Sequence, residues 1–172
     1  GLGDVYKRQE LDEHRAEEAQ TRLHRVGFGS FFHSQISREV FHVLFLNPPY
    51  LSVLTEGGSR VRSEKQFLVQ SIRTLMLGGL LVYIVPYYRL TPDICNILAE
   101  NFSDLSVWKF TDSEFARFHQ AVVLGLRRKP TEDDETADRL GAQTLTPEMI
   151  PCITELEENR YALPAVAKTV EV

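Results

Sequence analysis

Hydrophobic and polar positions along the chain predict strands and helices in alternation. Residues 41–46 and 80–85 are continuous apolar runs that predict buried strands, and the run at 80–85 is typical of a central parallel strand covered on both faces of a sheet. Apolar residues at helical spacing, with Ser63 and Gln66 as a capping box, predict a helix that starts at Ser63 and stops at Gly78. The other predicted elements are a helix over 12–25, a short strand within 26–32, a helix starting at Pro92, and strands over 105–110 and 120–126.

This order of elements predicts the fold class. Alternating strands and helices favour an α/β protein with a doubly wound, mostly parallel sheet and right-handed crossovers. The last two strands, 105–110 and 120–126, are joined by a stretch that does not read as a full helix. We therefore expect one antiparallel strand at the end of the sheet.

The ends of the chain differ in pattern from its middle. Residues 1–9 show no apolar periodicity, and we expect a leader that is foreign to the domain. Residues 10–129 carry the α/β pattern. The acidic run 131–135 predicts a solvated linker over 130–143, and 144–172 begins a further segment whose role the sequence does not define.

Composition limits the kinds of protein that fit. The 172 residues, 43% of them hydrophobic, suffice for one domain with a buried core. The longest apolar run, 75–86, is too short to span a membrane, so no membrane association is expected. Two cysteines and five scattered histidines show no ligand spacing, which predicts no metal site and a cytoplasmic location. The oligomeric state stays open.

Charge bears on nucleic-acid binding. The formal net charge is −5. Because phosphate contacts supply most of the affinity of proteins that wrap nucleic acid, this charge argues against such a role for the chain alone. Any contact with DNA must come from a local patch or from another part of the protein.

The chemistry of the chain is concentrated directly after the strand at 41–46, in Asn47-Pro48-Pro49-Tyr50. Both Asn47 and Pro48 precede a proline and are therefore held in extended geometry, while the prolines have no N–H to occupy nearby carbonyls. A planar amine could donate its two hydrogens to the Asn47 side-chain oxygen and the Pro48 carbonyl, with its ring stacked on Tyr50. Such bonding draws the nitrogen lone pair out of conjugation and supports the charge that develops during attack.

These four residues carry a family resemblance. A strand followed by Asn47-Pro48-Pro49-Tyr50 resembles the catalytic motif of class I S-adenosylmethionine-dependent amino-methyltransferases, best known among DNA adenine-N6 methylases. The resemblance implies a Rossmann-like methyltransferase fold, S-adenosyl-L-methionine as cofactor and DNA as partner. It also implies direct displacement of the methyl group, with no covalent enzyme intermediate.

The resemblance implies cofactor contacts as well, and it covers about residues 10–129. In the family, the second strand ends in an acid that binds the ribose hydroxyls, and Glu10 is the matching residue. The third strand commonly ends in an acid that binds the adenine amine, and the matching residue here is Ser30, which offers only a hydroxyl. The glycine-rich turn of the family does not precede Glu10. We therefore expect a fold that is incomplete at its N-terminus and a chain that is inactive alone.

Three further residues are candidates for target contact. Arg60 and Arg62 follow a glycine-bearing segment after the motif, where phosphates could meet them, and Tyr87 follows the strand at 80–85, where it could form an aromatic wall. Two other readings stay open. The same tetrapeptide can hold any planar amine, so the substrate could instead be a glutamine amide in a protein or a guanine amine in RNA. The altered cofactor contacts also fit a non-catalytic nucleic-acid-binding module.

Overall fold

The computed structural model describes residues 7–10, 13–22, 25–28, 31–33, 35–49, 52–54 and 60–164. The chain divides into two compact units, residues 1–37 and 38–172. The described elements of the first unit are β1 (Lys7–Glu10), α1 (Glu13–Gln20), β2 (Arg25–Phe28) and the 3-10 helix η1 (Phe31–His33).

In the first unit, β1 and β2 pair in parallel, with Lys7 opposite Arg25 and Glu10 opposite Phe28. Helix α1 connects them and buries Ala16 and Ala19. The predicted helix over 12–25 was too long, because α1 ends at Gln20 and Arg25 already belongs to β2. The assignment of residues 1–9 to a leader without a strand was wrong for the described part, because 7–9 belong to β1. Their polar sequence gave no strand signal, but their backbone pairs with β2 along residues 7–10.

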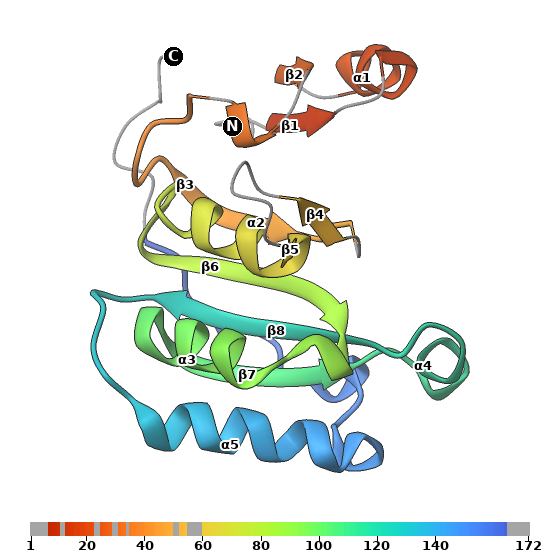
Figure 1. Ribbon diagram of the computed structural model, residues 1–172, viewed down its shortest axis with the longest axis vertical. Helices are drawn as coiled ribbons and strands as arrows, with labels where there is room; N and C mark the ends of the chain where they lie inside the picture. Colours follow the sequence, from red (N-terminus) through yellow and green to blue (C-terminus); the bar gives the residue numbers. More distant parts are fainter. Residues whose placement is uncertain are drawn as a thin grey trace. The chain divides into compact units, whose positions relative to one another are not determined.

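The second unit contains a mixed four-stranded sheet with the strand order β3-β6-β8-β7 (Figure 1). Strand β3 pairs in parallel with β6, whereas β8 is antiparallel to both β6 and β7. One antiparallel strand is thus confirmed, but its expected place at the end of the sheet was wrong, because β8 lies between β6 and β7. The described elements of this unit are β3 (Phe41–Leu46), β4 (Ser52–Leu54), β5 (Arg60–Arg62), α2 (Ser63–Ile72), β6 (Leu75–Pro86), η2 (Tyr87–Arg89), α3 (Pro92–Asn101), β7 (Phe102–Lys109), α4 (Asp112–Phe118), β8 (Gln120–Arg127), α5 (Asp134–Leu145), η3 (Pro147–Met149) and η4 (Ile153–Glu155).

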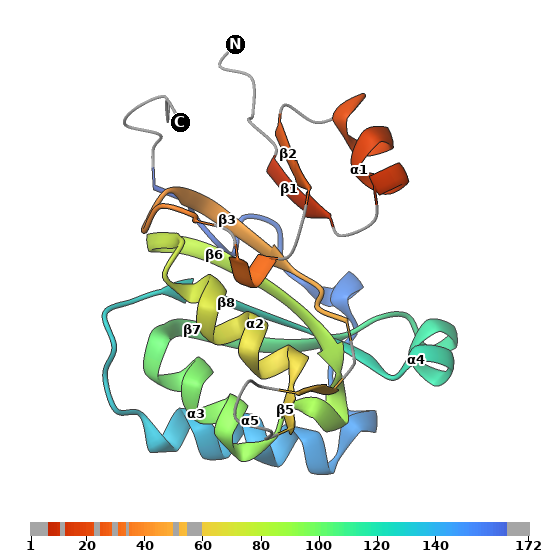
Figure 2. The ribbon, with the colours of Figure 1, turned by 45° about the horizontal axis from the view of Figure 1, so that its top comes forward.

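Strand β6 shows how the two faces of the sheet are covered. Its side chains alternate, so Leu81, Tyr83 and Val85 join the main core, which is completed by α2, α3 and α5. Figures 1 and 2 show α2 and α3 on this same face. Val82 and Ile84 point to the other face, where a smaller core includes residues of the segment after α5. Burial on both faces explains why the strand reads as a continuous apolar run.

The predicted helix at 63–78 was too long. Helix α2 ends at Ile72, where a turn brings the Thr74 N–H and hydroxyl to the Ser71 carbonyl oxygen at 2.9 and 2.7 Å. Leu75 then opens β6 opposite Phe41. The register of β6 shifts soon afterwards, near Gly78, whose positive φ of 77° suits glycine.

The predicted linker at 130–143 was also wrong, because most of it lies in α5. The Asp133 carboxylate caps this helix by accepting the Thr136 N–H at 3.1 Å, and Arg128 donates to it at 2.8 Å. These bonds lower the pKa of Asp133. Ala137 and Leu140 are buried in the main core. The acidic residues are the solvent-facing part of an amphipathic helix that packs on α3.

Two absences apply to the described part of the chain. No helix there is long and apolar enough to cross a membrane. Nor does that part contain a group of three or more histidine, cysteine or acidic side chains placed to hold a metal ion. Burial raises the pKa of the Cys95 thiol to about 11 and keeps it protonated.

Candidate active site

The motif lies where β3 ends, at the carboxyl edge of the parallel strands. Leu46, the last residue of β3, pairs with Tyr83 of β6, and Asn47 follows directly. Asn47 and Pro49 are exposed, whereas Pro48 between them is buried. Ligands of open α/β sheets bind at this edge. The buried proline anchors the turn, and the Asn47 amide stands at the surface. Tyr50 lies outside the described residues.

Tyr87 is brought to the same edge, because β6 runs parallel to β3 and ends at Pro86. The Tyr87 N–H donates to the His119 carbonyl oxygen at 2.8 Å, which ties η2 to the end of α4. Its half-buried ring contacts the rings of Tyr88, Phe115 and His119, with centroids 5.6, 5.7 and 6.3 Å away. Tyr87 is therefore held in a packed aromatic cluster, and the exposed ring next to it is that of Tyr88.

Glu64 and Arg89 form an ion pair at this edge that sequence reasoning missed. Glu64, in the first turn of α2, is 1% exposed, and its Oε1 lies 3.3 Å from Arg89 Nε at the end of η2. The Tyr83 hydroxyl donates to the Glu64 carbonyl oxygen at 3.1 Å. A glutamate in a first turn is ordinary in sequence, so nothing in the pattern distinguished Glu64.

Arg60 and Arg62 lie in β5, which pairs with β4 in an antiparallel hairpin and leads directly into α2. In the pairing, Arg62 stands opposite Ser52 and Arg60 opposite Leu54. The two arginines were expected in a loop after the motif. They instead occupy a short strand within that connection, between the motif and the helix that carries Glu64.

The cofactor candidates belong to the first unit. Glu10 is the last residue of β1, shortly before α1, which is the position that the family resemblance requires of the ribose-binding acid. Ser30 lies outside the described residues. The structure therefore places Glu10 as the sequence predicted and leaves its role, like that of Ser30, as a prediction.

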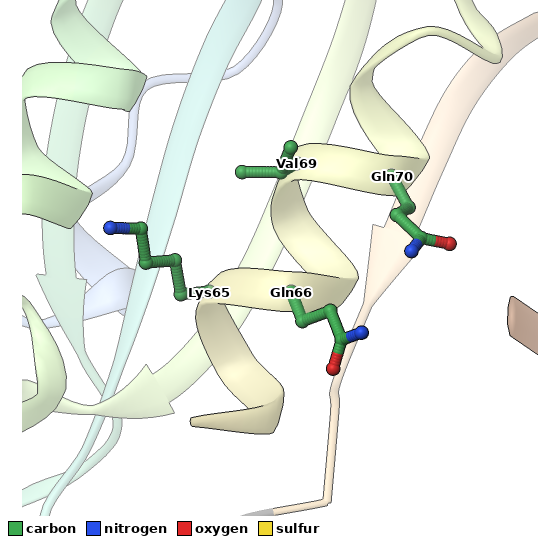
Figure 3. Close-up of a pocket in the computed structure, with 4 residues that line it drawn as sticks. All are labelled: Lys65, Gln66, Val69 and Gln70. Carbon is green, nitrogen blue, oxygen red and sulfur yellow. The ribbon is translucent and has the colours of Figure 1, made fainter. Parts of the chain in front are cut away.

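A surface cavity lies elsewhere, along α2. Its described lining residues are Lys65, Gln66, Val69 and Gln70 (Figure 3). Lys65 and Val69 point to one side of the helix and the two glutamines to the other. Lys65 already donates to Asp93 of α3 at 2.7 Å, and this contact lowers the pKa of Asp93. With its cation paired and only amides beside it, the described lining offers no reactive group.

The fold is that of the Rossmann-like methyltransferases. The chain is similar to the tRNA (m1A58) methyltransferase TrmI from Aquifex aeolicus, with 18% identity, a TM-score of 0.51, and coverage of 73% of this chain and 54% of that one. It is also similar to a protein from Listeria monocytogenes assigned to the class I S-adenosylmethionine-dependent methyltransferases, with 14% identity, a TM-score of 0.56, and coverage of 81% and 54%. The chain thus spans about half the length of these structures.

The sequence itself identifies the family. Residues 4–166 match the uncharacterised methyltransferase family DUF6094, and the chain belongs to that family. No curated protein matches it. S-adenosyl-L-methionine, predicted from the motif, is the cofactor that the family and the fold indicate. Of the residues expected to hold it, Glu10 fits by its place at the end of β1.

Proposed function

We propose that the full-length protein methylates the exocyclic N6 amine of adenine in DNA. The observation that carries this proposal is the placement of Asn47-Pro48-Pro49 at the carboxyl end of β3, with an exposed amide on an anchored turn. This is the edge at which open α/β sheets bind ligands, and the chain belongs to a methyltransferase family.

The proposed roles follow from hydrogen-bond chemistry. The adenine leaves the base stack, and its amine donates one hydrogen to the Asn47 side-chain oxygen and the other to the Pro48 carbonyl. Neither proline has an N–H to donate to other carbonyls nearby, and Tyr50 stacks on the ring. The cofactor supplies an electrophilic methyl group when bound. The chain orients the nitrogen lone pair toward it and stabilises the positive charge that develops on the amine.

The substrate class is tested by offering the full-length protein matched DNA, RNA and protein substrates with a methyl-labelled cofactor. The expected product is N6-methyladenine in DNA, identified by mass spectrometry of the nucleosides. Methylguanine in RNA or methylglutamine in protein would replace the proposal with one of the two other amines that this motif serves. The RNA arm is included because one fold relative is a tRNA methyltransferase.

We further propose that the 172-residue chain binds S-adenosyl-L-methionine weakly and does not turn over alone. Support comes from Ser30, which offers a hydroxyl where the family commonly has an acid. Isothermal titration of the purified chain should show no binding in the micromolar range. Micromolar affinity in a cooperatively melting monomer would contradict this proposal.

Arg60 and Arg62 are proposed to contact DNA phosphates. Replacing both with alanine in the full-length protein should lower the slope of log affinity against log salt by about 2, because each lost phosphate contact removes nearly one released counterion. Fluorescence anisotropy with a labelled duplex measures the slope. The control is Arg73→Ala with Lys129→Ala, two exposed cations that follow α2 and β8, away from the motif edge. Equal slopes in the two double variants would assign Arg60 and Arg62 to ordinary surface.

A further inference from the structure

Glu64 is a buried carboxylate that the proposed methyl transfer does not use. It is 1% exposed, and its ion partner Arg89 approaches at 3.3 Å. Neither Glu64 carboxylate oxygen nor Arg89 Nε takes part in a hydrogen bond within the described part of the chain. Within the described residues, the pair is therefore held by charge and not by a hydrogen bond.

Such a pair is poorly explained as a device for stability. Burying a carboxylate removes its hydration, and attraction to one imperfectly bonded partner offsets only part of that loss. Apolar side chains of similar volume often replace buried ion pairs without loss of stability. What a pair of this kind does fix is the position of the two segments that carry it.

The two segments are those that leave the carboxyl ends of neighbouring parallel strands. Glu64 lies in the first turn of α2, which follows the connection that starts from the motif. Arg89 ends η2, directly after Tyr87 and Tyr88, and its guanidinium carbon lies 5.6 Å from the centre of the Tyr88 ring. The Tyr83 hydroxyl also holds the Glu64 carbonyl oxygen, and Tyr83 pairs with Leu46, the residue before Asn47.

We propose that the Glu64–Arg89 ion pair is a positioning device that fixes η2 against the start of α2. It thereby fixes the position of Tyr87 and Tyr88 relative to the Asn47 turn, so that a planar base fits between the tyrosines and the turn. The role in methyl transfer rests on the proposed function. The anchoring of η2 by the ion pair does not depend on the proposed function.

The test replaces the pair with apolar side chains, as Glu64→Leu with Arg89→Met. Because both charges of the pair are removed together, the melting temperature should stay within a few degrees of the parent or rise. Hydrogen exchange is then measured at the Tyr87 and Leu90 amides, which donate to the His119 and Tyr87 carbonyl oxygens. Exchange there should become about tenfold faster or more, while exchange in α3 and α5 stays unchanged. In the full-length protein, kcat should fall about tenfold or more.

Two comparisons separate positioning from a merely structural role. Arg89→Lys keeps the charge and should recover part of the kcat and of the exchange protection. The control is Lys65→Met with Asp93→Leu, which removes an exposed ion pair at 2.7 Å between α2 and α3 and should change neither readout. If the apolar variant does not fold, Glu64→Gln is measured in the same way.

The outcomes distinguish this inference from the proposed function. Unchanged exchange at Tyr87 and Leu90 overturns the positioning role, whether or not the protein is active. Faster exchange with parental kcat overturns the link to methyl transfer. If the parent protein methylates none of the three substrates, the proposed function fails, and the exchange measurement alone decides whether the pair anchors η2.

Discussion

Asn47→Ala is expected to reduce methyl transfer by about 100-fold or more while leaving the protein folded. The substitution removes the side-chain oxygen proposed to accept a hydrogen bond from the target amine, and loss of one such electrostatic contact costs this much in enzymes. Asn47 is exposed, so its removal opens no cavity, and the melting temperature should change by only a few degrees.

The measurement is single-turnover transfer of labelled methyl by the full-length protein, read beside thermal unfolding. Asn96→Ala serves as the control, because it removes an exposed amide from α3, away from the motif. Tyr50→Ala should weaken target binding by about 1–3 kcal/mol through lost stacking. Parental turnover in Asn47→Ala would exclude the proposed mechanism.

The sequence predicted an element correctly where the hydrophobic pattern ends at residues that break regular structure, such as proline. Strand β3 was predicted with its exact bounds, because its apolar run stops at Asn47-Pro48. The prediction was wrong at the end of α2, because Leu75 and Met76 continue the helical spacing of the apolar residues before them. Only the turn at Thr74 and the pairing of Leu75 with Phe41 decide that these residues start a strand.

The candidate site divides in the same way. The motif could be found from sequence because its chemistry lies in consecutive residues. The Glu64–Arg89 pair could not be found in this way, because α2 precedes β6 in the sequence and η2 follows it, and only the folded chain brings the two residues together. Local pattern carries no information about such a contact, and Glu64 alone reads as a first-turn acid.

Helix α5 was predicted as a solvated linker because its acidic residues dominated the interpretation. Two residues on its inner face show that α5 packs on the core: Ala137 is 6% exposed and Leu140 is 1% exposed. Alanine at Leu140 should therefore destabilise the second unit by about 2–5 kcal/mol, since it leaves a cavity between α5 and the main core. The matched control is Leu145→Ala in the same helix, where the side chain is 82% exposed and the cost should stay within about 0.5 kcal/mol.

Denaturant unfolding followed by tryptophan fluorescence measures this difference. Trp108 is the single tryptophan of the chain and is buried on the opposite face of the sheet, where the segment after α5 covers it. It therefore reports unfolding of the sheet without contacting the substituted side chain. A large loss for Leu140→Ala with parental stability for Leu145→Ala would make α5 part of the folded domain. Equal midpoints for the two variants would restore the linker reading and place the domain boundary near residue 129.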